Sequence, residues 1–143
     1  MAEGTPDGLV VGSSREYLAL YGSLMSCVGG LRRLGDTRGL RYVGPCTMQG
    51  RLVDLGRYPG LVLQEGLVEA ELYEITDRAI LDGLDRFEGY HRHNAGLSVY
   101  VRRRVRLREP DCHAWVYIYN KPYAGRPVIA GGSWFEHVSQ PQG

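Results

Sequence analysis

Glycine residues recur along this chain and divide it into short segments. Twenty of the 143 residues are glycine, and between them apolar and polar side chains tend to alternate. Alternation with a period of two is typical of a half-buried β-strand, whereas glycine is favoured in the turns between strands. The sequence therefore predicts many short strands joined by turns.

Five segments are expected to be strands. In one of them Ala114, Val116 and Ile118 fall on the same face, because successive side chains of a strand point to opposite sides. Gly22 halts the first expected strand, and a turn at residues 58–60 follows the second. The expected strands are residues 17–21, 46–55, 67–75, 98–107 and 113–119.

One clear helix is expected between these strands. Its apolar side chains recur at helical spacing at Ile80, Leu81, Leu84 and Phe87. Thr76 is suited to cap its N-terminus, and Gly89 is suited to end it.

A second, weaker helix is expected at residues 23–34, where Gly29 and Gly30 would break or bend it. Many short strands with one or two helices predict an α+β domain. We expect its sheet to curl into a barrel-like form.

The composition limits the class of protein. A chain of 143 residues, 43% of them hydrophobic and 23% charged, is of ordinary globular type and supports one domain. We expect this domain to span residues 17–138, after a loose tail at residues 1–16 and before a polar end at residues 139–143. No apolar run approaches the roughly 20 residues needed to cross a bilayer, and we expect no membrane partner.

The charge balance argues against a nucleic-acid partner. Lys and Arg total 17 against 16 Asp and Glu, which gives a net charge of +1. Five arginines crowd one expected strand, but Arg104, Arg106 and Arg108 share one face, which is typical of a solvated surface. Arg102 has the same parity along the strand as these arginines. It can therefore point inward only if a bulge near Arg103 shifts the alternation.

The cysteines and histidines form no recognisable ligand set. Cys27, Cys46 and Cys112 are scattered and odd in number, which predicts no disulfide framework and fits a reducing cytoplasm. Neither they nor the histidines show the spacing of a metal-binding motif. We therefore expect no metal.

Residues 21–24 form the first candidate site. An expected strand stops at Gly22 and a helix is expected from about Ser23, so this turn presents backbone N–H groups without partners. Such a nest binds a carboxylate, a phosphate or a developing oxyanion. The same pattern also fits a plain strand–turn–helix link in which Ser23 only caps the helix.

Glu88 is the second candidate site. It follows Phe87 at the end of the expected helix, where the helix dipole and apolar neighbours should raise the pKa of its carboxyl. A carboxylate whose pKa approaches neutrality can act as a general base. The pattern also fits a solvated glutamate at a helix end, which is the commoner case.

Several motifs follow one another in a specific order along the chain. They are Tyr-Gly-Ser-Leu at 21–24, Gly-Arg-Leu-Val-Asp-Leu-Gly-Arg-Tyr-Pro-Gly at 50–60, Glu-Leu-Tyr-Glu-Ile at 71–75, Leu-Asp-Arg-Phe-Glu-Gly-Tyr at 84–90, Tyr-Val-Arg at 100–102, Trp-Val-Tyr-Ile-Tyr at 115–119 and Gly-Gly-Ser-Trp at 131–134. In this order they resemble the gamma-glutamylcyclotransferase superfamily. The resemblance is closer to its small AIG2-like branch, which includes gamma-glutamylamine cyclotransferase.

This resemblance implies a fold and a reaction. The fold would be a small mixed barrel-like sheet with flanking helices. The reaction would turn a γ-glutamyl amide into 5-oxoproline and a free amine, without a metal or an organic cofactor. The substrate would be a small-molecule or carrier-linked γ-glutamyl group, and the chain a monomer or a weak homodimer.

The resemblance also assigns residues. The family's catalytic glutamate matches Glu88, and the matched motifs supply the expected substrate-binding residues Tyr21, Gly22, Ser23, Leu24, Tyr100 and Tyr119. The larger glutathione-related enzymes usually carry Asn where Leu24 stands, which argues against glutathione-type dipeptides as substrates.

The implied chemistry needs few groups. Glu88 would take a proton from the substrate's α-amine, which then attacks the γ-carbonyl carbon while loop N–H groups stabilise the oxyanion. The alternative is a non-catalytic binding or regulatory module that holds a γ-glutamyl or carboxylate ligand, although an anionic Glu88 would not help it. Residues 91–97 and 120–131 are expected to recognise the leaving amine.

Overall fold

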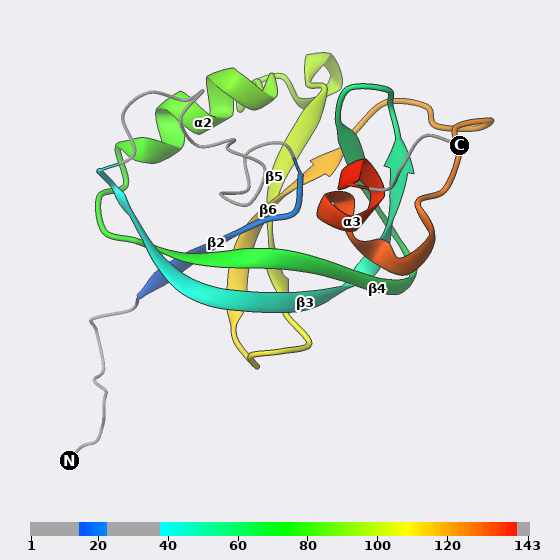
Figure 1. Cartoon of the computed structure of the whole chain (residues 1–143). Helices are drawn as coiled ribbons and strands as arrows, with labels where there is room; N and C mark the ends of the chain where they lie inside the picture. The colour runs from blue at the N-terminus through cyan, green and yellow to red at the C-terminus, as the bar shows by residue number, and fades with distance from the viewer. Residues whose placement is uncertain (1–14, 23–37, 140–143) are drawn as a thin grey trace.

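Five strands form one mixed sheet in the order β3-β4-β2-β6-β5 (Figure 1). The computed structural model describes residues 15–22 and 38–139. Neighbouring strands are antiparallel, except that β2 runs parallel to β6. The strands are β2 (Glu16–Leu20), β3 (Leu40–Asp54), β4 (Pro59–Ile75), β5 (Tyr100–Arg106) and β6 (His113–Tyr119).

The sheet is open, and the expected barrel-like closure is wrong. β3 and β5 are its two edges, and a closed barrel needs a continuous ladder between the edge strands. Within the described residues, no ladder joins β5 to β3; a single bridge links Thr47 of β3 to Glu109, which follows β5, and the Thr47 N–H donates to the Glu109 carbonyl at 2.8 Å. β5 ends at Arg106, before its own ladder reaches β3.

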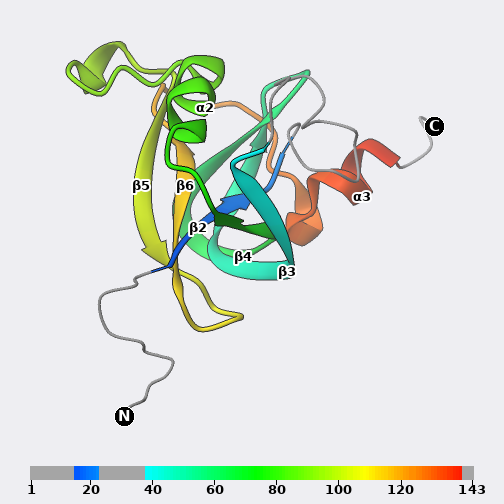
Figure 2. The ribbon, with the colours of Figure 1, turned by 90° about the vertical axis from the view of Figure 1, so that its left-hand side faces the viewer.

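β3 and β4 form a long hairpin that curves across the molecule (Figures 1 and 2). Both strands are longer than predicted, because their pairing continues through register shifts at Val43 and Gly50. Such irregularities bend a strand and break the period of two by which a sequence reveals it. The hairpin turn falls at residues 55–58, where the Leu55 N–H donates to the Tyr58 carbonyl at 3.0 Å.

The predicted helix is α2 (Ile80–Glu88), and Gly89 ends it as expected. Gly89 adopts the left-handed conformation (φ 69°), which glycine tolerates without a Cβ penalty. The predicted cap at Thr76 is wrong, since the N-cap is Ala79 and the Asp77 carboxylate accepts a hydrogen bond from the Ala79 N–H at 3.0 Å.

The other helical segments are short. They are the 3-10 helices η2 (Ala95–Leu97) and η3 (Ala130–Gly132) and the helix α3 (Trp134–Ser139), which lies apart from α2 (Figure 2). The helix expected at residues 23–34 lies outside the described residues, as does most of the expected N-terminal tail. No helix in the described part of the chain is long and apolar enough to cross a membrane.

The first three residues of β5 are all buried, and Arg102 is one of them. β5 and β6 pair in unbroken register from Tyr100 to Arg106, so the expected bulge near Arg103 is wrong. Arg102 is buried because α2 covers this part of the strand and supplies a partner. The side chains further along remain exposed as predicted, at Arg104, Arg106 and Arg108.

A buried ion pair joins α2 to the sheet. The Arg102 guanidinium donates to both carboxylate oxygens of Asp85, from Nε at 2.8 Å and from Nη2 at 3.1 Å. The Tyr117 hydroxyl also donates to Asp85 Oδ1, at 2.7 Å, and the guanidinium lies 4.6 Å from the Trp115 ring centroid. These contacts hold the C-terminal half of α2 against β5 and β6.

We expect Arg102→Ala to lower the free energy of unfolding by about 3–5 kcal/mol, because it leaves Asp85 buried without its counter-ion. The matched control is Arg106→Ala, which removes an equally well-formed pair with Asp111 that is exposed to solvent. Urea unfolding of both variants measures the difference. Equal losses of unfolding free energy in the two variants would show that burial does not increase the contribution of the Asp85–Arg102 pair to stability.

Candidate active site

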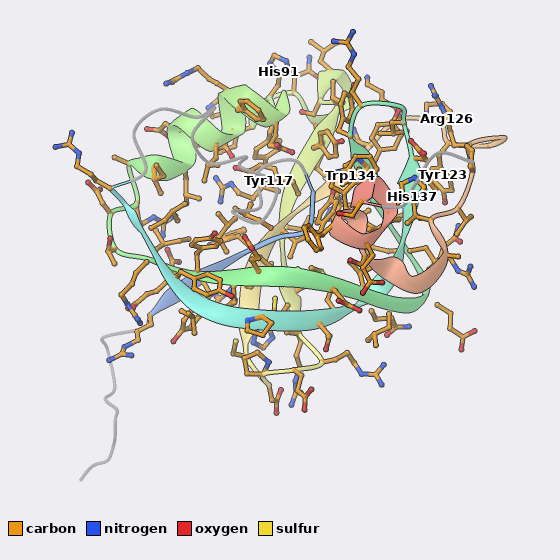
Figure 3. All side chains as sticks on the ribbon, viewed as in Figure 1. His91, Tyr117, Tyr123, Arg126, Trp134 and His137 are labelled. Atoms are coloured by element: carbon orange, nitrogen blue, oxygen red, sulfur yellow. The ribbon has the colours of Figure 1, made fainter. Side chains whose placement is uncertain are left out.

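A cavity of about 400 Å³ opens where four parts of the fold meet. They are the end of β2, the β3–β4 turn, the end of α2 and the adjoining ends of β5 and β6. Its described lining is mostly apolar and aromatic, and it includes Tyr21, Gly22, Pro59, Glu88, Tyr100 and Tyr117. Tyr117 lies below α2 in Figure 3.

Glu88 is the last residue of α2, and its half-buried side chain forms part of the cavity wall. Burial among the apolar lining residues raises the pKa of the Glu88 carboxyl to about 7. No hydrogen bond or opposite charge from a described residue counteracts this effect. The structure therefore gives the cavity one carboxyl group that exchanges protons near neutral pH.

Two buried tyrosine hydroxyls of the inner wall, those of Tyr21 and Tyr100, are hydrogen-bonded to backbone groups. Tyr21 donates to the Tyr117 carbonyl at 2.6 Å and accepts from the Leu61 N–H at 3.1 Å. Tyr100 donates to the Pro59 carbonyl at 2.7 Å. Burial raises the pKa of both phenols, so they stay neutral and shape the wall.

Gly22 brings the end of β2 close to the β3–β4 turn. A Cβ atom at this position would lie 2.8 Å from Cγ and 3.0 Å from Cδ of Pro59, which is too close for carbon atoms. Glycine is therefore needed for the approach of the two segments. Ser23 and Leu24, the other two loop residues expected to bind substrate, lie outside the described residues.

Tyr119 does not line the cavity. Its ring packs edge-on against Tyr100, with centroids 5.6 Å apart, and its side chain occupies the space that a Cβ at Gly60 would need. The structure thus brings together Tyr21, Gly22, Glu88 and Tyr100 among the predicted site residues. Tyr119 packs against the Tyr100 ring without being part of the cavity lining.

Sequence reasoning missed two contributions to the lining. They are Tyr117 of β6 and the consecutive residues Arg57, Tyr58 and Pro59 at the β3–β4 turn, for which the sequence predicts no part in the site. The available signal was the glycine-bounded motif at residues 50–60, which predicts a turn but not what that turn faces. Neither residues 91–97 nor residues 120–131 contribute to the described lining.

Metal-ligating side chains do not gather in the described part of the structure. No group of three or more His, Cys, Asp or Glu residues there is arranged to hold an ion. Cys46 is buried, and its pKa is raised by burial to about 12, which favours the neutral thiol.

Comparisons with known proteins agree with this fold and identify a family. A family model described as "Gamma-glutamyl cyclotransferase, AIG2-like" matches residues 18–136. The gamma-glutamylcyclotransferase family protein YtfP of Escherichia coli K12 is 36% identical over 86 residues, which are 60% of this chain and 68% of YtfP. The gamma-L-glutamyl-butirosin B gamma-glutamyl cyclotransferase of Niallia circulans is 33% identical over 78 residues, which are 52% of this chain and 49% of that protein.

A solved structure shares the fold. The crystal structure of an AIG2-like protein from Mus musculus aligns with a TM-score of 0.61 and 21% identity, covering 83% of this chain and 87% of the mouse chain. The family match over residues 18–136 shows that the chain belongs to the AIG2-like gamma-glutamyl cyclotransferase family. The family predicted from the order of motifs is thereby confirmed.

We expect Gly22→Ala to destabilise the protein by about 1–3 kcal/mol, because the new methyl group overlaps Pro59. Gly83→Ala is the matched control, since a Cβ there meets nothing within 4 Å and alanine favours the helix. Urea unfolding of both variants tests the prediction. It is wrong if Gly22→Ala is as stable as Gly83→Ala.

Proposed function

We propose that the protein converts a γ-glutamyl amide into 5-oxoproline and a free amine. The observation that carries the proposal is Glu88, a carboxyl with a pKa raised to about 7 in the wall of a largely apolar cavity. Family membership supports the γ-glutamyl class of substrate. The relative from Niallia circulans is a cyclotransferase of gamma-L-glutamyl-butirosin B, which also carries a γ-glutamyl group.

Glu88 serves as both base and acid. Its carboxylate takes a proton from the substrate's α-ammonium group, and the freed amine attacks the γ-carbonyl carbon to close a five-membered ring. The bond from the γ-carbon to the leaving nitrogen then breaks as protonated Glu88 gives its proton to that nitrogen, and Glu88 relays the second proton of the ring nitrogen to the same amine, which leaves as an ammonium ion. The reaction consumes no water, and the zwitterionic γ-glutamyl amide yields the 5-oxoproline carboxylate and the ammonium ion, so atoms and charge balance.

The cavity contributes by shape. The nucleophile and the electrophile belong to one molecule, so the protein needs to hold the γ-glutamyl chain in a conformation that can cyclise. The neutral tyrosines of the inner wall provide a rigid surface for this purpose. Backbone N–H groups of residues 22–24 are proposed to stabilise the oxyanion, each contributing about 3 kcal/mol.

We expect Glu88→Gln to lower turnover by about a hundredfold or more, because the amide keeps the size of the side chain but cannot accept the proton. The matched control is Glu69→Gln, which makes the same chemical change at an exposed position of β4 outside the cavity. Release of 5-oxoproline from γ-glutamyl amides is the readout. Near-normal turnover in Glu88→Gln would exclude Glu88 as the base.

The raised pKa predicts the pH dependence of the reaction. Because the base must be deprotonated, kcat/KM should rise with pH through about 7 and then level off. A profile that is already flat at pH 5 would contradict this assignment.

Stability provides an independent check on the same pKa. A carboxyl whose pKa is raised on folding stabilises the fold below its unfolded value of about 4.5, and this stability is lost as the pH rises through about 7. The free energy of unfolding of the wild type should therefore fall across this window relative to Glu88→Gln. A difference that stays constant with pH would show an unshifted pKa.

A further inference from the structure

The cavity has an exposed rim, which we define as Arg57, Tyr58 and Phe87. These are the only exposed side chains in its described lining, with Tyr58 43% and Phe87 44% exposed. The tyrosines of the inner wall are at most 7% exposed. A ligand whose reacting end lies on the inner wall beside Glu88 therefore extends its other end across the rim.

Arg57 carries a charge that the described residues do not neutralise. The nearest acidic residue along the chain is Asp54, in the same turn. Its carboxylate accepts a hydrogen bond from the Gly56 N–H at 2.8 Å and pairs with His137 Nε2 at 2.9 Å. Because Asp54 is engaged there, the Arg57 guanidinium remains available to an anion at the cavity mouth.

Arg57 and Glu88 occupy different parts of the cavity lining, since Arg57 is exposed at the rim whereas Glu88 is half-buried at the end of α2. The Glu88 pKa is raised by burial, and no cation among the described residues lowers it. In a γ-glutamyl group the α-carboxylate is bonded to the carbon that carries the α-amine. Once that amine is beside Glu88, the α-carboxylate is beside it too, so Arg57 faces the opposite end of the substrate.

We propose that the rim binds the leaving group, and that this group is an amine bearing both a carboxylate and a large apolar side chain. Its carboxylate pairs with Arg57, while its side chain packs against Tyr58 and Phe87. The substrates of this class are γ-glutamyl derivatives of aromatic or large aliphatic amino acids, which differ from glutathione-type dipeptides in the large apolar side chain of the leaving group. A cationic leaving group would meet the charge of Arg57, and Glu88 is the only acid in the described lining.

The inference rests on the proposed function but is tested separately from it by binding. Three probes differ only at the leaving group: γ-glutamylphenylalanine, γ-glutamylphenethylamide, which lacks the second carboxylate, and γ-glutamylcadaverine, which is cationic. Calorimetric titration into Glu88→Gln measures affinity without turnover. We expect γ-glutamylphenylalanine to bind about tenfold more tightly than the phenethylamide, and the cadaverine derivative to bind most weakly.

Variants of the rim residues test which side chain produces the preference for the carboxylated probe. Adding Arg57→Gln to the Glu88→Gln protein should abolish the tenfold preference by weakening only the carboxylated probe, whereas Arg57→Lys should retain part of it. The matched control is Arg108→Gln, which removes an exposed arginine outside the cavity and should leave all three affinities unchanged. Phe87→Ala should weaken both aromatic probes alike.

Three results would overturn the inference. They are failure of γ-glutamylphenylalanine to bind, binding of the cadaverine derivative at least as tight, and equal weakening of both aromatic probes by Arg57→Gln. The last result would assign Arg57 to the α-carboxylate instead. Failure of the proposed function has a different signature, because wild-type protein would then release no 5-oxoproline from any probe while the binding preference persists.

Discussion

The buried ion pair between Asp85 and Arg102 sets the geometry of the candidate site. Asp85 lies one helical turn before Glu88 in α2, so whatever anchors Asp85 also determines where Glu88 lies. The bidentate contact from β5 and the Tyr117 hydroxyl from β6 fix that turn of the helix at three points. A buried charge pair costs desolvation energy. Here the pair anchors the turn of α2 that carries Glu88, and it thereby positions the unpaired Glu88 carboxyl at the cavity wall.

Hydrogen bonds from tyrosine to backbone assemble the rest of the cavity. The Tyr100 hydroxyl holds the β3–β4 turn through the Pro59 carbonyl, and Tyr21 joins β2 to β6 and to β4. The hydroxyls of Tyr21 and Tyr100 are thus engaged in hydrogen bonds that stabilise the fold. Within the described lining, proton exchange near neutral pH is consequently left to Glu88.

Local patterns predicted local structure well. The strand at residues 113–119 and the helix end at Gly89 are confirmed, because alternation and a left-handed glycine are properties of the segment itself. An inward-pointing Arg102 was considered only together with a bulge near Arg103, because its burial without a bulge depends on Asp85, which is 17 residues away in the chain. The open sheet and the rim at Arg57 depend on how distant segments meet, and one sequence does not specify this.

The central claim is that Glu88 titrates near neutrality because the fold buries it without a counter-charge. Its pKa can be measured directly by following the side-chain carboxyl ¹³C resonance with pH, assigned by comparison with Glu88→Gln. The account predicts a midpoint of about 7 for Glu88. A midpoint at the ordinary glutamate value of about 4.5 would contradict it.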